Sequence, residues 1–171
     1  MDLGDEKPHN TAMRIENSIL LGGSFDPVHR GHLEIARFVA SAVGASRVVL
    51  MPTARNPLKR PPVASDAQRL AMLRLATQED SLFFVSDFEL QRGVSYTIDT
   101  IEALQRDGAT NLMLLMGADN LRDLPRWRRV DDLLAAVQPV VACRPPSGFA
   151  EAAAAVEALA GVGAVADQYL L

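Results

Sequence analysis

A short apolar run that ends in two glycines constrains this chain more than any other feature. Residues 19–21 read Ile-Leu-Leu and are followed directly by Gly22 and Gly23. After a further polar stretch, apolar side chains recur at helical spacing over residues 31–43, and Gly44 follows. This pattern predicts a buried parallel strand, a turn that no side chain may crowd, and a helix. Such a unit is typical of an α/β protein.

The turn leads into the start of a helix, which is a natural site for an anion. Free backbone N–H groups and the positive end of the helix dipole converge there. His29 and His32 lie three residues apart across this start, so both can face one anion and donate hydrogen bonds to it. The pattern indicates phosphate binding; the alternative is an ordinary turn with two exposed histidines. The P-loop and dinucleotide-binding patterns are absent from the sequence.

The rest of the chain continues the alternation of apolar runs and helical periodicity. Strands are predicted over residues 47–51, 82–85, 111–116 and 139–143, and helices over 66–78, 98–107, 130–136 and 149–160. A polar turn is expected at residues 91–93, and a last short strand within 161–171. Strand, helix and strand in series form a right-handed unit. We predict a Rossmann-like fold: a parallel sheet of five or more strands, helices on both faces, and the glycine turn at the carboxyl edge, where ligands bind.

Length and composition restrict the class of protein. The 171 residues suit one domain, with residues 1–14 as a disordered extension and 15–171 as the domain. A net charge of −4 argues against non-specific nucleic-acid binding, and no apolar run is long enough to cross a membrane. A single cysteine, Cys143, excludes an internal disulfide and fits a reducing cytoplasm. Because Cys143 ends a predicted strand, we expect it to be buried and inert.

Residues 23–32 carry a resemblance to a known family. They read Gly-Ser-Phe-Asp-Pro-Val-His-Arg-Gly-His, which resembles the signature of the HxGH nucleotidyltransferases. With Gly22 before it, the string is similar to that of bacterial nicotinate-nucleotide adenylyltransferases. The resemblance implies transfer of an adenylyl group from ATP, with Mg²⁺ on its phosphates, to nicotinate mononucleotide in NAD biosynthesis. It implies that His29 and His32 are catalytic, together with backbone N–H groups near Ser24.

The resemblance also implies which residues bind the two substrates. Those implied for ATP come from the glycine turn and from the end of a later strand: Gly22, Gly23, Ser24, Phe25, His29, His32, Gly117 and Asp119. Those implied for the mononucleotide are Ser24, Lys59, Arg60, Thr97, Trp127 and Arg128. A carboxylate directly after a strand can accept two hydrogen bonds from a ribose diol, although an acid there is also a common helix cap.

Local physics gives some of these positions a second interpretation. The segment 52–63 holds four prolines and three cations, Arg55, Lys59 and Arg60. It is either a solvated linker or a rim that contacts phosphate, and which cation does so stays open.

Two further positions carry the same ambiguity. Ser95 or Thr97 can be merely the N-cap of the helix that follows. Trp127, the only tryptophan, can belong to the core, although three arginines and a proline surround it. Arg128 stands where some relatives carry an aromatic residue.

The sequence leaves rival functions open. One is another adenylyltransferase of the same fold, such as phosphopantetheine adenylyltransferase. The other is a module that binds a mononucleotide without turning it over. The family continues through a Ser/Thr-rich turn ending in an arginine, which holds the ATP phosphates, and no such string follows Gly148. We expect, therefore, that a C-terminal portion of the family domain is absent. The preference between nicotinate and nicotinamide, and formation of a homo-oligomer, stay open.

Overall fold

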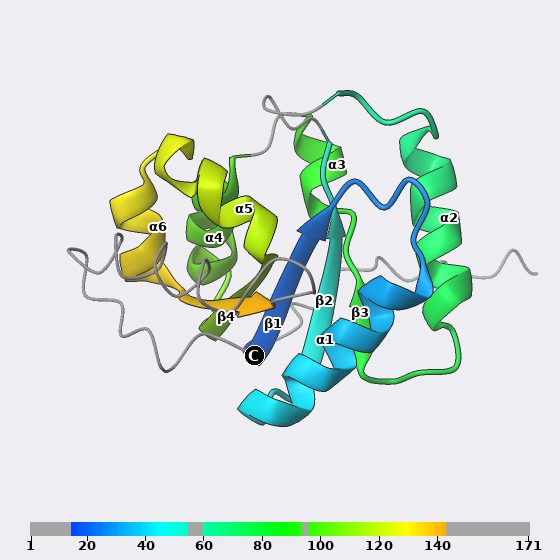
Figure 1. The fold of residues 1–171 in the computed structure, drawn as a ribbon, viewed down its shortest axis with the longest axis horizontal. Coiled ribbons are helices and arrows are strands. Elements are labelled where there is room, and N and C mark those ends of the chain that lie inside the picture. Colours follow the sequence, from blue (N-terminus) through cyan, green and yellow to red (C-terminus); the bar gives the residue numbers. More distant parts are fainter. Residues whose placement is uncertain (1–14, 55–59, 94–95, 143–171) are drawn as a thin grey trace, which may run out of the picture.

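Five parallel strands form the centre of the molecule. The computed structural model describes residues 15–54, 60–93 and 96–142, without the side chains of Asp119 and Arg122. Along the sheet the strand order is β3-β2-β1-β4-β5. The strands are β1 (Glu16–Gly23), β2 (Arg47–Pro52), β3 (Phe83–Val85), β4 (Thr110–Gly117) and β5 (Gln138–Ala142), as Figure 1 shows. The predicted parallel sheet is confirmed, and β1 occupies its middle.

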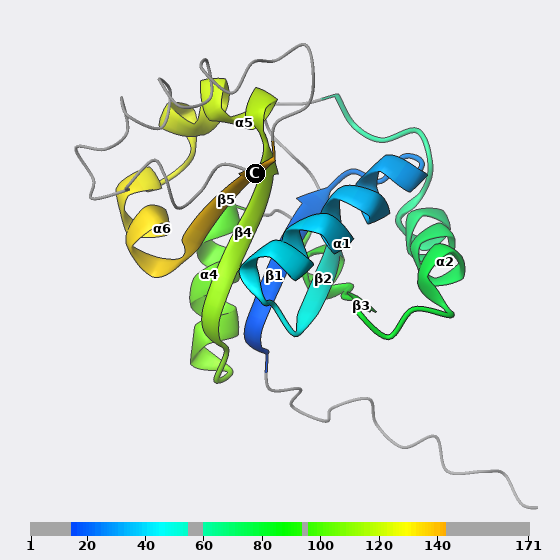
Figure 2. The same ribbon diagram turned by 60° about the horizontal axis from the view of Figure 1, so that its bottom comes forward.

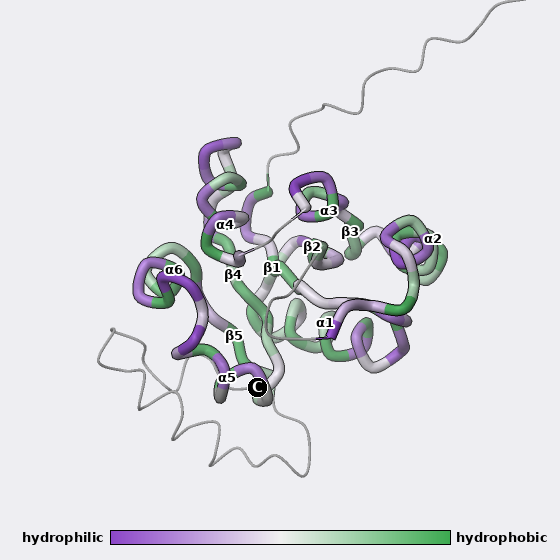
Figure 3. The backbone as a smooth tube through the Cα atoms, turned by 90° about the horizontal axis from the view of Figure 1, so that it is seen from above, coloured by the Kyte–Doolittle hydropathy of each residue, from purple (hydrophilic) through white to green (hydrophobic). Residues whose placement is uncertain are grey.

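Helices cover both faces of this sheet. They are α1 (Arg30–Val43), α2 (Asp66–Thr77), α3 (Phe88–Arg92), α4 (Thr97–Arg106), α5 (Ala118–Asp123) and α6 (Val130–Ala136), with a short 3₁₀ turn η1 (Leu124–Arg126). Figures 2 and 3 show α1 and α4 on opposite sides of the sheet. No helix in the part of the chain described here has the length and apolar character needed to span a membrane.

Alternate residues of the strands supply two apolar layers. Leu20 of β1 packs in one buried cluster with side chains of α4 and α6, while its neighbour Ile19 packs in another with side chains of α1 and α2. The pairing of the strands keeps residues of one layer side by side: Leu20 pairs with Val49 of β2 and with Leu114 of β4, and all three belong to the first cluster. The central strands are thus buried on both faces, which explains their continuous apolar sequence.

The helix ends largely follow local chemistry. Gly44, which follows α1, has φ +68, and its N–H donates to the Ala40 carbonyl, so a left-handed residue closes the helix as predicted. At the start of α2, Ser65 Oγ accepts from the Gln68 N–H at 3.3 Å, and Gln68 Oε1 accepts from the Ser65 N–H at 2.9 Å. This reciprocal pair is a capping box, which satisfies two N–H groups at the start of the helix.

Two local predictions are wrong. Residues 91–93 do not form a simple polar turn, because Phe88–Arg92 form the short helix α3, held by a buried hydrogen bond between Thr100 and Glu89. Thr97 is not the N-cap of α4 but its first residue: Tyr96 occupies the N-cap position, and its carbonyl accepts from the Thr100 N–H. The expectations for residues 1–14, Ser95, Cys143 and the segment 149–171 lie outside the described residues.

Candidate active site

A cavity of about 430 Å³ opens at the carboxyl edge of the sheet. Its floor includes Gly22, Gly23 and Ser24 at the end of β1. One wall comes from the start of α4 and includes Thr97, and the other includes Trp127 in the segment after η1. This is the edge at which open α/β folds bind ligands, and the volume suits a small molecule. The cavity therefore gathers residues from three distant parts of the chain.

A side chain at Gly23, in the floor of the cavity, would crowd the ring of Phe25. A Cβ placed on Gly23 would lie 3.3 Å from the ring of Phe25. That ring is only 2% exposed and packs in the core beneath α1. The side chain of Phe25 is thus inside the protein, and what this residue presents at the turn is its backbone, whose φ is +47.

The two histidines form one unit at the start of α1. Their ring centroids lie 3.7 Å apart, with the planes inclined by 20°. The backbone N–H of His29 donates to Nδ1 of His32 at 3.3 Å, so a neutral His32 carries its proton on Nε2. The edge of His32 also contacts Phe25, with ring centroids 5.2 Å apart. Neither histidine is among the described residues that line the cavity, whereas Ser24, earlier in the same turn, does line it.

Trp127 and Arg128 shape the wall opposite α4. Trp127 is partly buried, packs against the core cluster and lines the cavity. Its backbone N–H donates to the Leu124 carbonyl at 2.9 Å. Arg128 lies over the ring of Tyr96, with the guanidinium carbon 4.7 Å from the ring centroid. Nη1 of Arg128 is also 3.6 Å from a carboxylate oxygen of Asp99. Arg128 thus connects the two walls of the cavity.

Glu89 is one of the cavity residues that the sequence did not indicate. Glu89 is 6% exposed and lines the cavity, and its Oε1 accepts from the Thr100 hydroxyl at 2.9 Å. Its position depends on α3, which the sequence pattern did not predict. No local motif distinguishes Glu89 from an ordinary acid on a turn.

Other predicted residues lie elsewhere or outside the description. Lys59 is outside the described residues, and Arg60 is exposed and does not line the cavity. Gly117 ends β4 and is the N-cap of α5 but does not line the cavity either. Asp119 is the second residue of α5, and its side chain is not described.

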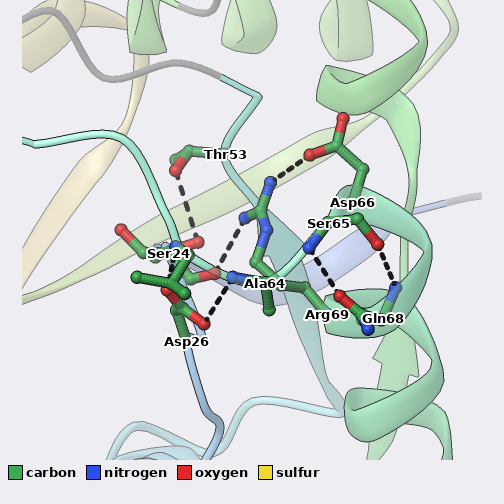
Figure 4. A network of polar contacts seen from close by, with 10 residues as sticks. Ser24, Asp26, Thr53, Ala64, Ser65, Asp66, Gln68 and Arg69 are labelled. Carbon is green, nitrogen blue, oxygen red and sulfur yellow. Dashed lines mark hydrogen bonds and ion pairs between the residues drawn. The ribbon is translucent and has the colours of Figure 1, made fainter.

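A second layer of polar residues lies beneath the glycine turn (Figure 4). Arg69, on α2, donates through Nη1 to the Ser24 carbonyl at 2.8 Å and through Nη2 to Asp66 at 2.6 Å. The carboxylate of Asp26 accepts from the N–H groups of Val63 and Ala64, at 2.5 and 3.1 Å. The turn is therefore tied to the segment that leads into α2. The sequence analysis did not single out Arg69.

The fold and the site define a class of protein. A five-stranded parallel sheet, with a glycine turn, paired histidines and a cavity at its carboxyl edge, is a Rossmann-like nucleotidyltransferase fold. The sequence profile described as "Cytidylyltransferase-like" matches residues 20–165, and the chain belongs to this family.

Within this family, the chain is similar to curated relatives that share one name. A protein of Roseiflexus sp., named "Probable nicotinate-nucleotide adenylyltransferase", is 45% identical over 128 residues, which are 74% of this chain and 64% of the relative. One of the same name from Aquifex aeolicus is 38% identical over 72% of this chain and 74% of its own. These relatives confirm the resemblance seen in residues 22–32. The chain spans about three fifths of the length of the Roseiflexus and Herpetosiphon aurantiacus relatives, at 64% and 59%.

A solved structure supports the fold. Nicotinic acid mononucleotide adenylyltransferase from Plasmodium falciparum, complexed with NaAD, superposes with a TM-score of 0.68. The match covers 78% of this chain and 67% of that one at 16% identity. At this identity the likeness concerns the fold, which is the predicted one.

Proposed function

We propose that this chain transfers the adenylyl group of MgATP to nicotinate mononucleotide, forming nicotinate adenine dinucleotide and pyrophosphate. The observation that carries the proposal is the lining of the cavity, in which an aromatic wall at Trp127 and the glycine turn at Gly22, Gly23 and Ser24 belong to the same cavity. A flat pyridine ring fits against such a wall, and phosphates fit at the helix start. The relatives' names support this choice of substrates.

In the proposed reaction the phosphate oxygen of the mononucleotide attacks the α-phosphorus of ATP in line. The bond from that phosphorus to the oxygen bridging toward the β-phosphate breaks, and pyrophosphate leaves with the electron pair. Negative charge moves onto oxygens near the start of α1. His32, with its proton on Nε2, donates a hydrogen bond to these oxygens, and His29 stacks beside it. Catalysis rests on orientation and charge stabilisation, without a covalent intermediate.

The Mg²⁺ in this proposal enters with ATP, bound to its phosphates. Within the described residues there is no group of three or more His, Cys, Asp and Glu side chains that could hold a metal ion. The protein's part is to receive the phosphates with backbone N–H groups and histidines. We further propose that the chain works in the cytoplasm on small molecules rather than on nucleic acid, which its net charge of −4 and single cysteine support.

The test is pyrophosphate release from MgATP by the full chain with three acceptors in parallel. These are nicotinate mononucleotide, nicotinamide mononucleotide and phosphopantetheine. The proposal predicts release with the first acceptor, at a kcat/KM above those for the other two. Release with phosphopantetheine alone would assign the chain to the rival adenylyltransferase. Binding of nicotinate mononucleotide without any release would identify a binding module.

A further inference from the structure

One arginine is completely buried beneath the glycine turn (Figure 4). Arg69 is 0% exposed, and Asp66, its carboxylate partner, has a side chain that is 57% exposed. Nε of Arg69 is buried without a hydrogen-bond partner among the described residues. Burying a guanidinium costs free energy, and a well-packed apolar side chain in its place is often neutral or stabilising. Stability alone therefore does not account for an arginine here.

What Arg69 does hold is the backbone of the turn. Its Nη1 donates to the Ser24 carbonyl at 2.8 Å. The preceding carbonyl, of Gly23, accepts from the Thr53 N–H at 2.9 Å. Two successive carbonyl groups of the turn thus accept hydrogen bonds from the segment after β2, one from Thr53 and one from Arg69 on α2. In a planar trans peptide the C=O and the N–H point in opposite directions. The N–H groups of Ser24 and Phe25 therefore point away from this segment.

The conformation at Phe25 requires such support. Its φ of +47 lies in the left-handed region, which is sterically unfavourable for a residue that has a Cβ. Residues held in such conformations persist only where their surroundings fix them, and they concentrate at functional sites. The buried ring of Phe25 fixes one side of this residue, and the bond from Arg69 to Ser24 fixes the peptide before it.

From this geometry we infer that Arg69 is a positioning residue for the phosphate-binding turn. It holds the Ser24–Phe25 peptide so that the Phe25 N–H is presented to a phosphate of the nucleotide, and it places a buried positive charge behind that peptide. The inference rests on the proposed function, because it takes ATP as the ligand of the turn. It assigns to α2, which lies outside the cavity wall, a part in the reaction.

The experiment compares Arg69→Gln, Arg69→Lys and the control Arg74→Gln, which changes an exposed arginine on the same helix. Pyrophosphate release is measured well below the unfolding temperature of each variant, with the folded fraction taken from circular dichroism. We expect Arg69→Gln to lower kcat by about 10²-fold, the effect of a misplacement of about 1 Å. The KM for nicotinate mononucleotide stays within about twofold, since Arg69 does not line its cavity.

The lysine variant separates positioning from folding. A lysine keeps the charge and one donor for the Ser24 carbonyl but loses the planar two-point contact. We expect it to recover about tenfold of the kcat lost in Arg69→Gln, while Arg74→Gln equals the parent. A kcat within twofold of the parent in folded Arg69→Gln would overturn the inference, as would no recovery in Arg69→Lys. If Arg69→Gln does not fold, the kcat of Arg69→Lys is compared with that of the parent. A kcat about tenfold lower supports the inference, and an unchanged kcat overturns it.

Calorimetric binding of MgATP keeps this inference separate from the proposed function. A parent chain that releases no pyrophosphate contradicts the proposed function, yet its affinity for MgATP still reports on the turn. In that case a tenfold weaker MgATP affinity in the folded Arg69 variant supports the positioning role. Equal affinity in variant and parent, or no MgATP binding by either, overturns it.

Discussion

The imidazole rings of His29 and His32 stack with their centroids 3.7 Å apart at the start of α1. The contact is reinforced by the hydrogen bond from the His29 N–H to Nδ1 of His32. Each histidine therefore restricts the orientation of the other, and the His32 ring also makes a T-shaped contact with Phe25. A ring held in this way suits the proposed role of a preorganised hydrogen-bond donor to a phosphate.

The first prediction concerns His32. Its replacement in His32→Ala should lower kcat for pyrophosphate release by about 10²–10³-fold, or about 2.7–4 kcal/mol, as for other preorganised donors. Steady-state kinetics with MgATP and nicotinate mononucleotide measure this loss. The exposed residue Glu34 on the same helix provides a control, in Glu34→Gln. Activity of His32→Ala within twofold of the parent would exclude the assigned role.

Replacement of Trp127 should weaken the binding of nicotinate mononucleotide and leave the binding of MgATP almost unchanged. In Trp127→Ala the cavity loses its aromatic wall, and we expect nicotinate mononucleotide to bind about 5- to 150-fold more weakly, since loss of a base stacked on an aromatic ring costs about 1–3 kcal/mol. The affinity for MgATP should change by less than twofold. Titration calorimetry with each ligand measures both. Equal weakening of the two ligands would contradict this assignment, and Trp127→Phe should retain most of the affinity.

Arg128 should contribute to the preference for nicotinate mononucleotide over nicotinamide mononucleotide. Its guanidinium lines the cavity and lies over Tyr96, with Asp99 3.6 Å away as a partial counter-charge. A cation at this place favours the carboxylate of nicotinate over the neutral amide of nicotinamide. Because the side chain is 53% exposed, we expect Arg128→Gln to reduce the ratio of the two affinities by about fivefold or less. The effect should decline with added salt. An unchanged ratio at low salt would assign the discrimination to other groups.

The ion pair between Arg37 and Asp80 makes stability depend on pH. Nε of Arg37 donates to Asp80 at 2.8 Å, and the Leu82 N–H donates to the same carboxylate at 3.0 Å. These bonds hold the pKa of Asp80 below its ordinary value of 3.8. Because the folded pKa is the lower one, the stabilisation is complete above the unfolded pKa. It is lost as the pH falls through the folded value.

Asp80→Asn should therefore destabilise the protein at neutral pH only. We expect the free energy of unfolding to fall by roughly 0.5–1 kcal/mol at pH 7, the range for a partly exposed pair. The difference from the parent should shrink as the pH falls through the lowered pKa of folded Asp80 and be absent in acid below it. Urea denaturation at the two pH values measures it, with Glu79→Gln, an exposed neighbour, as control. An equal loss at both pH values would show that the charge of Asp80 is not the cause.

The sequence predicted those parts of the fold that depend on local chemistry. The double glycine before the histidines, the apolar runs of β1 and β4, and Gly44 after α1 each follow from steric or burial rules that act within a few residues. The predictions failed where a distant contact decides. Helix α3 depends on the bond between Glu89 and Thr100, and neither residue carries a local signal for it.

The site was predictable to a similar degree. Trp127 and Thr97 could be associated with the cavity through the family resemblance, and both line it. The burial of Phe25 and the contact of Arg69 with Ser24 could not be anticipated, because each depends on how α1 and α2 pack against the sheet. A charged residue on a short amphipathic helix is usually exposed, and nothing within α2 marks Arg69 as different.

The central position of β1 implies that the two sides of the site differ in how readily they open locally. As the middle strand of five, β1 is the strand whose amide hydrogens should exchange with solvent most slowly, at a rate set by global unfolding. The wall that carries Trp127 follows α5 and η1, which have only six and three residues and open at lower cost. The turn at the end of β1 is thus held by the middle of the sheet, whereas the aromatic wall of the cavity rests on two short elements.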